Sequence, residues 1–193
     1  MKIGILGGSF DPIHNGHIAL LKAARKALGL ESIYLVPTHR TPLKERALSP
    51  DRHRAAMARA AIRGIPYARL SLFEIRGGKV SYTVDTLRYF RRRFGKKTEL
   101  YFLCGTDLLR NLRRWKSPGE VRRLAGFAVV ARPGAPARRL PANAVFLPMK
   151  PVLVSSTGVR RALERGRSGA ALVPPPVWRY IRRHRLYRKT PVC

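Results

Sequence analysis

Two histidines near the N-terminus have the spacing of a phosphate-binding pair. His14 and His17 are separated by three positions, Gly16 lies between them, and an apolar pattern with helical spacing begins at Ile18. This spacing can place both imidazoles on one face at the start of the helix. There they could donate hydrogen bonds to phosphate oxygens that gain charge as the phosphorus is attacked. The alternatives are zinc binding, for which no third ligand is nearby, and a structural role, which would require buried polar partners.

A glycine turn precedes the two histidines. Gly7, Gly8 and Ser9 follow a short apolar run at residues 2–6, which is typical of a buried parallel strand. Glycines at this point let the main chain approach a phosphate closely and direct N–H groups at it, and the start of the following helix adds a partial positive charge. Many glycine turns are only tight turns, so the histidines decide the interpretation.

A second candidate anion site lies near the C-terminus. Hydroxyl side chains at residues 155–157 leave an apolar run and open a predicted helix. They can cap the first amides of that helix, and the remaining N–H groups together with Arg160 would bind an anion. The alternative is an ordinary helix cap followed by a solvated arginine.

The elements that must position these residues alternate between strand and helix. The pattern predicts strands at residues 2–6, 32–37, 70–75, 99–104, 127–131 and 145–147, and helices at 18–28, 51–63, 84–94, 158–165 and 177–184. Such alternation predicts an α/β fold: a single doubly wound, mostly parallel sheet with helices on both faces. We expect one domain over residues 1–193, with its ligand beyond the carboxyl ends of the strands.

The composition restricts the choice of function. Apolar residues make up 45% of the 193 positions, as in globular proteins, but 40 basic and 10 acidic residues give a net charge of +30. Such a charge attracts anions, yet it can equally reflect a biased genome or heat tolerance. No recognition-helix, zinc-finger or RNA-binding aromatic signature is present, so no specific nucleic-acid partner is expected. A dehydrogenase is disfavoured because the glycine turn lacks a spaced third glycine and Pro12 follows too soon.

The cysteines and the apolar segments indicate a cytoplasmic protein. Cys104 and Cys193 form neither a disulfide framework nor a metal-binding pattern, and Cys104 lies in an apolar run where a buried, inert thiol is expected. No apolar stretch is long enough to span a bilayer, and the run at residues 3–6 is too short for a signal peptide. We therefore expect no membrane partner, whereas assembly into a homo-oligomer is compatible with these features.

Several blocks of sequence carry a resemblance to a known family. Residues 8–17, Gly-Ser-Phe-Asp-Pro-Ile-His-Asn-Gly-His, resemble the signature of the nucleotidyltransferase superfamily with the HxGH motif. Further blocks resemble the bacterial nicotinate-nucleotide adenylyltransferases and occur in that family's order: 81–87, 105–107 with Trp115, 131–134, 155–157 with Arg160, and 180–187. The loop after the second strand departs from the family pattern of two prolines, a histidine and a lysine. Only Pro42 and Lys44 match there, because Leu43 replaces the histidine.

The resemblance implies an enzyme that transfers an adenylyl group from ATP to nicotinate mononucleotide. It implies that Mg²⁺ enters with ATP, that no protein residue is a metal ligand, and that the C-terminal helices at about 157–187 complete the ATP site. The implied catalytic residues are His14 and His17. The residues implied to bind ATP are Gly8, Ser9, Phe10, His14, His17, Lys44, Gly105, Asp107, Ser155, Ser156, Thr157 and Arg160. Those implied to bind nicotinate mononucleotide are Tyr82, Thr83, Trp115 and Arg132.

Some of these assignments have competing interpretations. Trp115 could fill the core instead of contacting the nicotinate ring, and Arg132 could be a solvated loop arginine. Within the superfamily the acceptor could instead be phosphopantetheine or nicotinamide mononucleotide. The block at residues 81–87 argues against phosphopantetheine.

The distribution of charge leads to a first prediction. Because basic residues are spread along the whole chain, we expect only sequence-independent binding to DNA or RNA, and counterion release makes such binding fall steeply with salt. Fluorescence anisotropy titrations over a range of salt concentrations measure this slope. Tight binding to one sequence that persists at high salt would instead indicate a nucleic-acid-binding protein.

Overall fold

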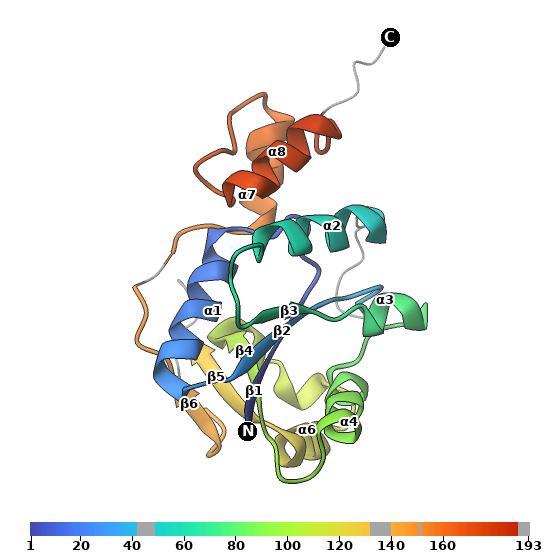
Figure 1. The fold of residues 1–193 in the computed structure, drawn as a ribbon, viewed down its shortest axis with the longest axis vertical. Helices are drawn as coiled ribbons and strands as arrows, with labels where there is room; N and C mark the ends of the chain where they lie inside the picture. The colour runs from blue at the N-terminus through green and yellow to red at the C-terminus, as the bar shows by residue number, and fades with distance from the viewer. Residues whose placement is uncertain (42–48, 132–139, 151, 189–193) are drawn as a thin grey trace.

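The computed structural model describes residues 1–41, 49–131, 140–150 and 152–188, and these residues form a parallel sheet (Figure 1). The strands in chain order are β1 (Lys2–Gly8), β2 (Ser32–Pro37), β3 (Ala68–Leu70), β4 (Glu99–Gly105), β5 (Gly126–Val130) and β6 (Ala144–Phe146). They lie side by side in the order β3-β2-β1-β4-β5-β6, and every neighbouring pair is parallel. The predicted doubly wound α/β fold is therefore confirmed, and the strand order reverses between β1 and β4.

Helices cover both faces of the sheet. On one face, α1 (Asn15–Leu28) and α2 (Asp51–Ala61) share a core with α7 (Ser156–Glu164) and α8 (Pro175–Arg183), and Figure 1 shows these last two helices beyond α2. The other face packs against α4 (Thr83–Phe94) and α6 (Pro118–Leu124). Because side chains of a strand alternate between faces, Leu103 of β4 joins the first core while Phe102 and Cys104 join the second.

The end of β1 differs from the prediction. We expected the strand to stop at Leu6, but Gly7 and Gly8 continue it and lie in register with Val36 and Pro37 of β2. Neither glycine has a positive φ; their importance is the space they leave. A Cβ at Gly8 would lie 3.2 Å from the ring of Phe10, which is tighter than ordinary packing. The strand ends at Gly8, and the loop into α1 begins at Ser9.

The strand predicted at residues 70–75 is wrong. Strand β3 ends at Leu70, and a short helix, α3 (Phe73–Gly77), follows. Packing against α4 explains the helix: the Phe73 ring stacks on Tyr89 with centroids 4.2 Å apart, and the buried carboxylate of Glu74 accepts a hydrogen bond from Thr86. These tertiary contacts override the strand propensity of the apolar residues.

The remaining elements follow the sequence closely, apart from three short ones. Helix α1 ends where predicted, because Gly29 adopts φ 62° in the left-handed region and its N–H donates to the carbonyl of Arg25 at 3.1 Å. The pattern did not predict α5 (Thr106–Leu109), the 3₁₀ turn η1 (Leu112–Arg114) or α6, which are too short to show a helical period. None of the described helices is both long and apolar enough to cross a bilayer.

The buried Glu74 leads to a prediction on the pH dependence of stability. Burial raises the pKa of this carboxyl above its ordinary value near 4.5, so the folded chain binds the proton more tightly than the unfolded chain. The stability gained in this way is complete below the ordinary pKa and is lost as the pH rises through the raised pKa. The substitution Glu74→Gln keeps a side-chain oxygen that can accept the hydrogen bond from Thr86, and the glutamine amide cannot ionise. We therefore expect its free energy of unfolding to exceed that of the wild type increasingly above about pH 4.5.

Urea unfolding of both proteins between acid and neutral pH measures this difference. Glu31→Gln serves as the control because the Glu31 side chain is 59% exposed, and its curve should parallel that of the wild type. Parallel curves for Glu74→Gln and the wild type would contradict the prediction.

Candidate active site

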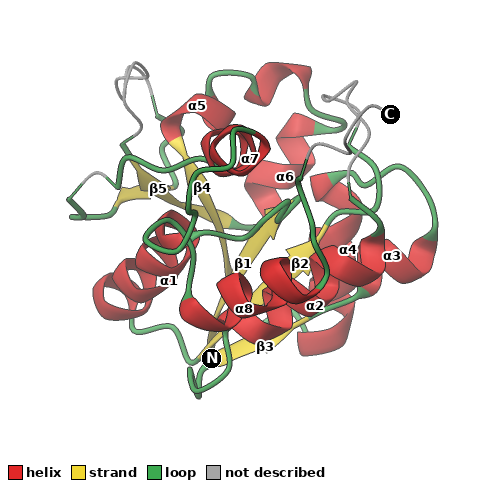
Figure 2. Ribbon diagram, turned by 90° about the horizontal axis from the view of Figure 1, so that it is seen from above, coloured by secondary structure: helices red, strands yellow, loops and turns green. Residues whose placement is uncertain are grey.

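A large cavity lies where the strand order reverses. It has a volume of about 1330 Å³ and is lined by residues from the carboxyl ends of β1 and β4 and from the start of α7. Figure 2 locates these three elements in the fold. Parallel α/β sheets bind ligands at this position because the chain leaves the two neighbouring strands in opposite directions. Most of the residues implied to bind ATP line this cavity: Gly8, Ser9, His14, His17, Gly105, Asp107, Ser155, Ser156, Thr157 and Arg160.

The two histidines open helix α1 and lie against each other. His14 is the N-cap residue in an extended conformation, and its N–H donates to Nδ1 of His17 at 3.1 Å. Because this nitrogen accepts, a neutral His17 carries its proton on Nε2, where it can be donated. The ring centroids are 3.7 Å apart, and His14 is only 2% exposed. The structure thus brings the pair together at one wall of the cavity.

The surroundings of Gly16, between the two histidines, leave little room for a side chain. A Cβ at Gly16 would lie 3.1 Å from Nδ1 of His14 and 3.2 Å from Cγ1 of Val154. Any larger residue would push the His14 ring or the segment before α7 away from the cavity. Phe10 has a related supporting position, since its buried ring packs edge-on against His17 with centroids 5.2 Å apart. Phe10 itself is not among the residues that line the cavity, so it supports the site from behind the His17 ring.

The start of α7 shows the helix cap that was the alternative interpretation, but without the solvated arginine. Ser155 is an ordinary N-cap, and its Oγ accepts from the N–H of Gly158 at 3.0 Å. Arg160, however, is 8% exposed and not solvated. Its Nη1 donates to the carbonyl of Asp11 at 2.6 Å and its Nη2 to Oγ1 of Thr157 at 3.1 Å. The arginine is therefore fixed between α7 and the loop that leads into α1.

The end of β4 supplies the opposite wall. Gly105 is the N-cap of α5, and the exposed carboxylate of Asp107 follows at the rim of the cavity. Cys104 is buried beside them, as predicted. Burial raises the pKa of its thiol, and the negative charge of Asp107 raises it further, so the group remains a thiol at neutral pH.

The residues assigned to nicotinate mononucleotide form a separate group on the α4 face. Tyr82 caps α4, and Nζ of Lys116 lies 4.5 Å from the centroid of its ring. Trp115 packs edge-on against Phe102 with centroids 5.8 Å apart. Neither Tyr82, Thr83 nor Trp115 lines the cavity, although the ring of Phe102 lies 3.5 Å from a Cβ position at Gly7. Trp115 therefore does pack against the core, which was the alternative interpretation for this residue.

Two of the residues assigned from the sequence, Lys44 and Arg132, lie outside the described residues. Arg161 and Glu164 line the cavity but were not predicted, although they follow Thr157 at positions i+4 and i+7 of one helix face. That helical spacing was the signal that could have identified them. No cluster of three or more potential metal ligands occurs among the residues that the structure describes.

Comparison with known proteins agrees with this geometry. The model of the cytidylyltransferase-like family matches residues 5–162. A protein of Thermus thermophilus named "Probable nicotinate-nucleotide adenylyltransferase" is 40% identical over 188 residues, covering 97% of this chain and 100% of that protein. A protein of Thermoanaerobacter sp. with the same name is 34% identical over 201 residues, covering 98% and 95%.

Solved structures show the same fold at lower identity. The nicotinic acid mononucleotide adenylyltransferase of Plasmodium falciparum, solved in complex with NaAD, superposes with a TM-score of 0.78 at 19% identity and covers 96% of this chain and 97% of that one. The matches over nearly the full length, together with the paired histidines at the β1–β4 cavity, establish the family. The chain belongs to the nicotinate-nucleotide adenylyltransferases of the cytidylyltransferase-like family and is a nucleotidyltransferase enzyme.

Proposed function

We propose that the protein transfers the adenylyl group of ATP to nicotinate mononucleotide and forms nicotinate adenine dinucleotide and pyrophosphate. The observation that carries this proposal is the pairing of His14 and His17 beside the buried Arg160 at one cavity. Further support comes from the names of the relatives and from the NaAD bound to the Plasmodium falciparum neighbour.

In this proposal ATP occupies the cavity between β1, β4 and α7. Its phosphates face the main chain at Gly8, Ser9 and Phe10, the two histidines and Arg160. Its ribose hydroxyls donate to Asp107 beside Gly105, since a carboxylate after a strand suits that role. Residues 155–157 lie near the nucleotide, and Lys44 is assigned to ATP from the family resemblance alone. Residues 1–193 then act as one nucleotidyltransferase domain whose C-terminal helices, at about 157–187, complete the ATP site.

The reaction is a direct in-line displacement at the α-phosphorus. A phosphate oxygen of the mononucleotide forms a bond to this phosphorus as the bond to the bridging oxygen of the β-phosphate breaks, and pyrophosphate leaves with the electron pair. The attacking group is already an anion, so no general base and no covalent intermediate are required. The protein contributes position and charge stabilisation. Nε2–H of His17 is suited to stabilise the charge that gathers on the phosphate oxygens, because Nδ1 is already occupied by the N–H of His14.

Mg²⁺ is proposed to accompany ATP and not to occupy a cage of protein ligands. Asp107 and Glu164 are the carboxylates among the described residues that line the cavity, which fits a hydrated ion held mainly by phosphates. Bound in this way, the ion would neutralise charge on the phosphates.

The acceptor is proposed to bind near the start of α4. Tyr82 and Thr83 stand at the N-terminus of this helix, where the first N–H groups have no partner within the helix and carry a partial positive charge. Trp115 would present its ring to the nicotinate, and Arg132 would bind the mononucleotide phosphate. A carboxylate on the pyridine ring suits this helix start better than a neutral amide.

A histidine substitution tests the catalytic assignment. We expect His17→Ala to lower kcat at least about 100-fold, as on removal of a preorganised donor that stabilises developing charge. Folding should change little, because the lost acceptor for the His14 N–H is worth about 1 kcal/mol, as for other helix caps. Steady-state kinetics and thermal unfolding measure the two effects. His53→Ala, which removes a histidine that contacts Tyr180 of α8, is the control. A folded His17→Ala enzyme with near-normal kcat is incompatible with the assignment.

The acceptor assignment predicts a preference for nicotinate over nicotinamide mononucleotide. The field of the helix start contributes roughly 0.3–2 kcal/mol, and hydrogen bonds to a charged acceptor add about 1.5–3 kcal/mol. Together these values correspond to a ratio of kcat/KM between about 10-fold and several thousand-fold, on the order of one factor of ten per 1.4 kcal/mol. The measurement compares both acceptors at saturating ATP with Mg²⁺, with the product identified. Equal values would overturn the acceptor assignment and leave adenylyl transfer standing.

Substitutions at Thr83 refine this test. Thr83 is the first residue of α4, a position at which proline is compatible with the helix but removes one N–H. Thr83→Pro should therefore reduce the preference strongly, whereas Thr83→Ala, which retains the N–H, should reduce it less. The reverse order would indicate that the threonine hydroxyl, and not the main chain, selects the acceptor.

A further inference from the structure

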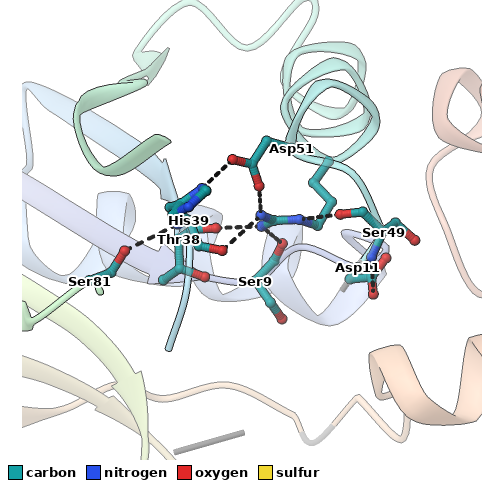
Figure 3. A network of polar contacts seen from close by, with 8 residues as sticks. Ser9, Asp11, Thr38, His39, Ser49, Asp51 and Ser81 are labelled. Atoms are coloured by element: carbon teal, nitrogen blue, oxygen red, sulfur yellow. Dashed lines mark hydrogen bonds and ion pairs between the residues drawn. The ribbon is translucent and has the colours of Figure 1, made fainter. Parts of the chain in front are cut away.

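Arg54 of α2 is a fully buried arginine at the centre of a hydrogen-bond network (Figure 3). It is 0% exposed, and its guanidinium group donates to four main-chain carbonyls. Nε donates to Ser49 at 2.9 Å, Nη1 to Ser9 at 2.8 Å and Thr38 at 2.6 Å, and Nη2 to His39 at 3.3 Å. Nη2 also donates to Oδ1 of Asp51.

These acceptors belong to separate parts of the chain. Ser9 begins the loop after β1, Thr38 and His39 follow β2, and Ser49 and Asp51 lead into α2. A planar group with five donors in fixed directions can hold all three segments in one arrangement, whereas an ammonium group has only three donors at a single point. The network therefore sets the end of β1 relative to β2 and α2.

The bond to the Ser9 carbonyl acts on the peptide group that joins Ser9 to Phe10. Because the peptide group is planar, the N–H of Phe10 points in the opposite direction to the Ser9 carbonyl. Phe10 also has φ +47°, in the left-handed region, which costs a non-glycine residue about 1–2 kcal/mol. Anchoring the Ser9 carbonyl to Arg54 holds this unfavourable turn and fixes the direction of the Phe10 N–H. Ser9 lines the cavity, and the Phe10 ring packs edge-on against His17 with centroids 5.2 Å apart, so the same anchor also holds the His17 ring.

The charge of Arg54 is itself balanced within the network. Asp51 accepts from Arg54 through one carboxylate oxygen, while its other oxygen contacts Nδ1 of His39. The main-chain N–H of His39 donates to Oγ of Ser81 at 3.1 Å, and Ser81 lies next to the start of α4. A single connected set of contacts thus runs from the β1 loop to the segment assigned to the acceptor.

We propose that Arg54 is a positioning residue for adenylyl transfer, which acts by fixing the Ser9–Phe10 peptide and thereby the main-chain donors and the His17 ring at the phosphates. The proposal rests on the function proposed above. Arg54 touches no substrate in this scheme. Its removal misplaces the phosphate-binding loop, and a misplacement of about 1 Å can reduce the rate about 100-fold.

Chemical rescue tests this role. Arg54→Ala leaves a buried space lined by four carbonyls, which a free guanidinium ion can fill. We expect kcat to fall about 100-fold, the KM for nicotinate mononucleotide to change little, and millimolar guanidinium chloride to restore a substantial part of kcat. Sodium and methylammonium chloride at equal ionic strength should not restore it. Circular dichroism is used to choose an assay temperature at which the variant is fully folded without guanidinium. Recovery of kcat at that temperature then reflects repositioning of the loop and not refolding of the protein.

Two further variants and the wild type distinguish a failure of the positioning role from a failure of the proposed function. Arg59→Ala removes an exposed arginine of the same helix and should retain wild-type kcat. If Arg54→Ala does not fold, Asp51→Asn replaces it as the test, because it removes the charge that orients Arg54 and should lower kcat in a folded enzyme. Wild-type kcat in a folded Arg54→Ala or Asp51→Asn protein overturns the positioning role, as does a loss that guanidinium cannot restore in Arg54→Ala. A wild-type protein without activity on ATP and nicotinate mononucleotide would instead refute the proposed function.

Discussion

The loop between β1 and α1 is buried, and its main-chain carbonyls must therefore find donors elsewhere in the chain. Arg54 donates to Ser9, Arg160 to Asp11, and the hydroxyl of Ser156 to Pro12 at 2.9 Å. The donors come from α2 and α7, which are distant in sequence. The carbonyls of this loop are hydrogen-bonded only when β1, α2 and α7 assemble around it. The cavity lies where β1 and α7 meet.

The buried carboxylate of Asp11 also needs a hydrogen-bond donor, and the C-terminal part of the chain supplies one. This side chain is 1% exposed and accepts from the hydroxyl of Tyr187 at 2.6 Å and from the N–H of Ser49 at 3.3 Å. Burial raises the pKa of Tyr187, and the charge of Asp11 raises it further, so the phenol remains a donor across the physiological range. The C-terminal helices are therefore attached to the loop by polar contacts as well as by the apolar core.

The sequence predicts those parts of the molecule whose signal is local. Strands β1, β2 and β4, helix α4 and the glycine stop at Gly29 follow from hydrophobic period and cap chemistry, and the spacing of the histidines predicts their placement together. The helix at Phe73 was not predictable because contacts with α4 determine it. Arg54 gives no signal of its own, since a buried arginine in an alanine-rich helix resembles the many surface arginines and its acceptors are main-chain carbonyls.

The net charge of +30 is a poor guide to which basic residues matter. Among the described residues, Arg54 and Arg160 are the two buried arginines, and both donate to carbonyls of the same loop. Burying a guanidinium group costs free energy unless hydrogen bonds satisfy it, and the network around each one supplies them. Salt screens exposed charges over about 8–10 Å but weakens buried pairs much less. Salt therefore weakens the interactions of the surface charges much more than those of the two buried arginines that hold the phosphate-binding loop.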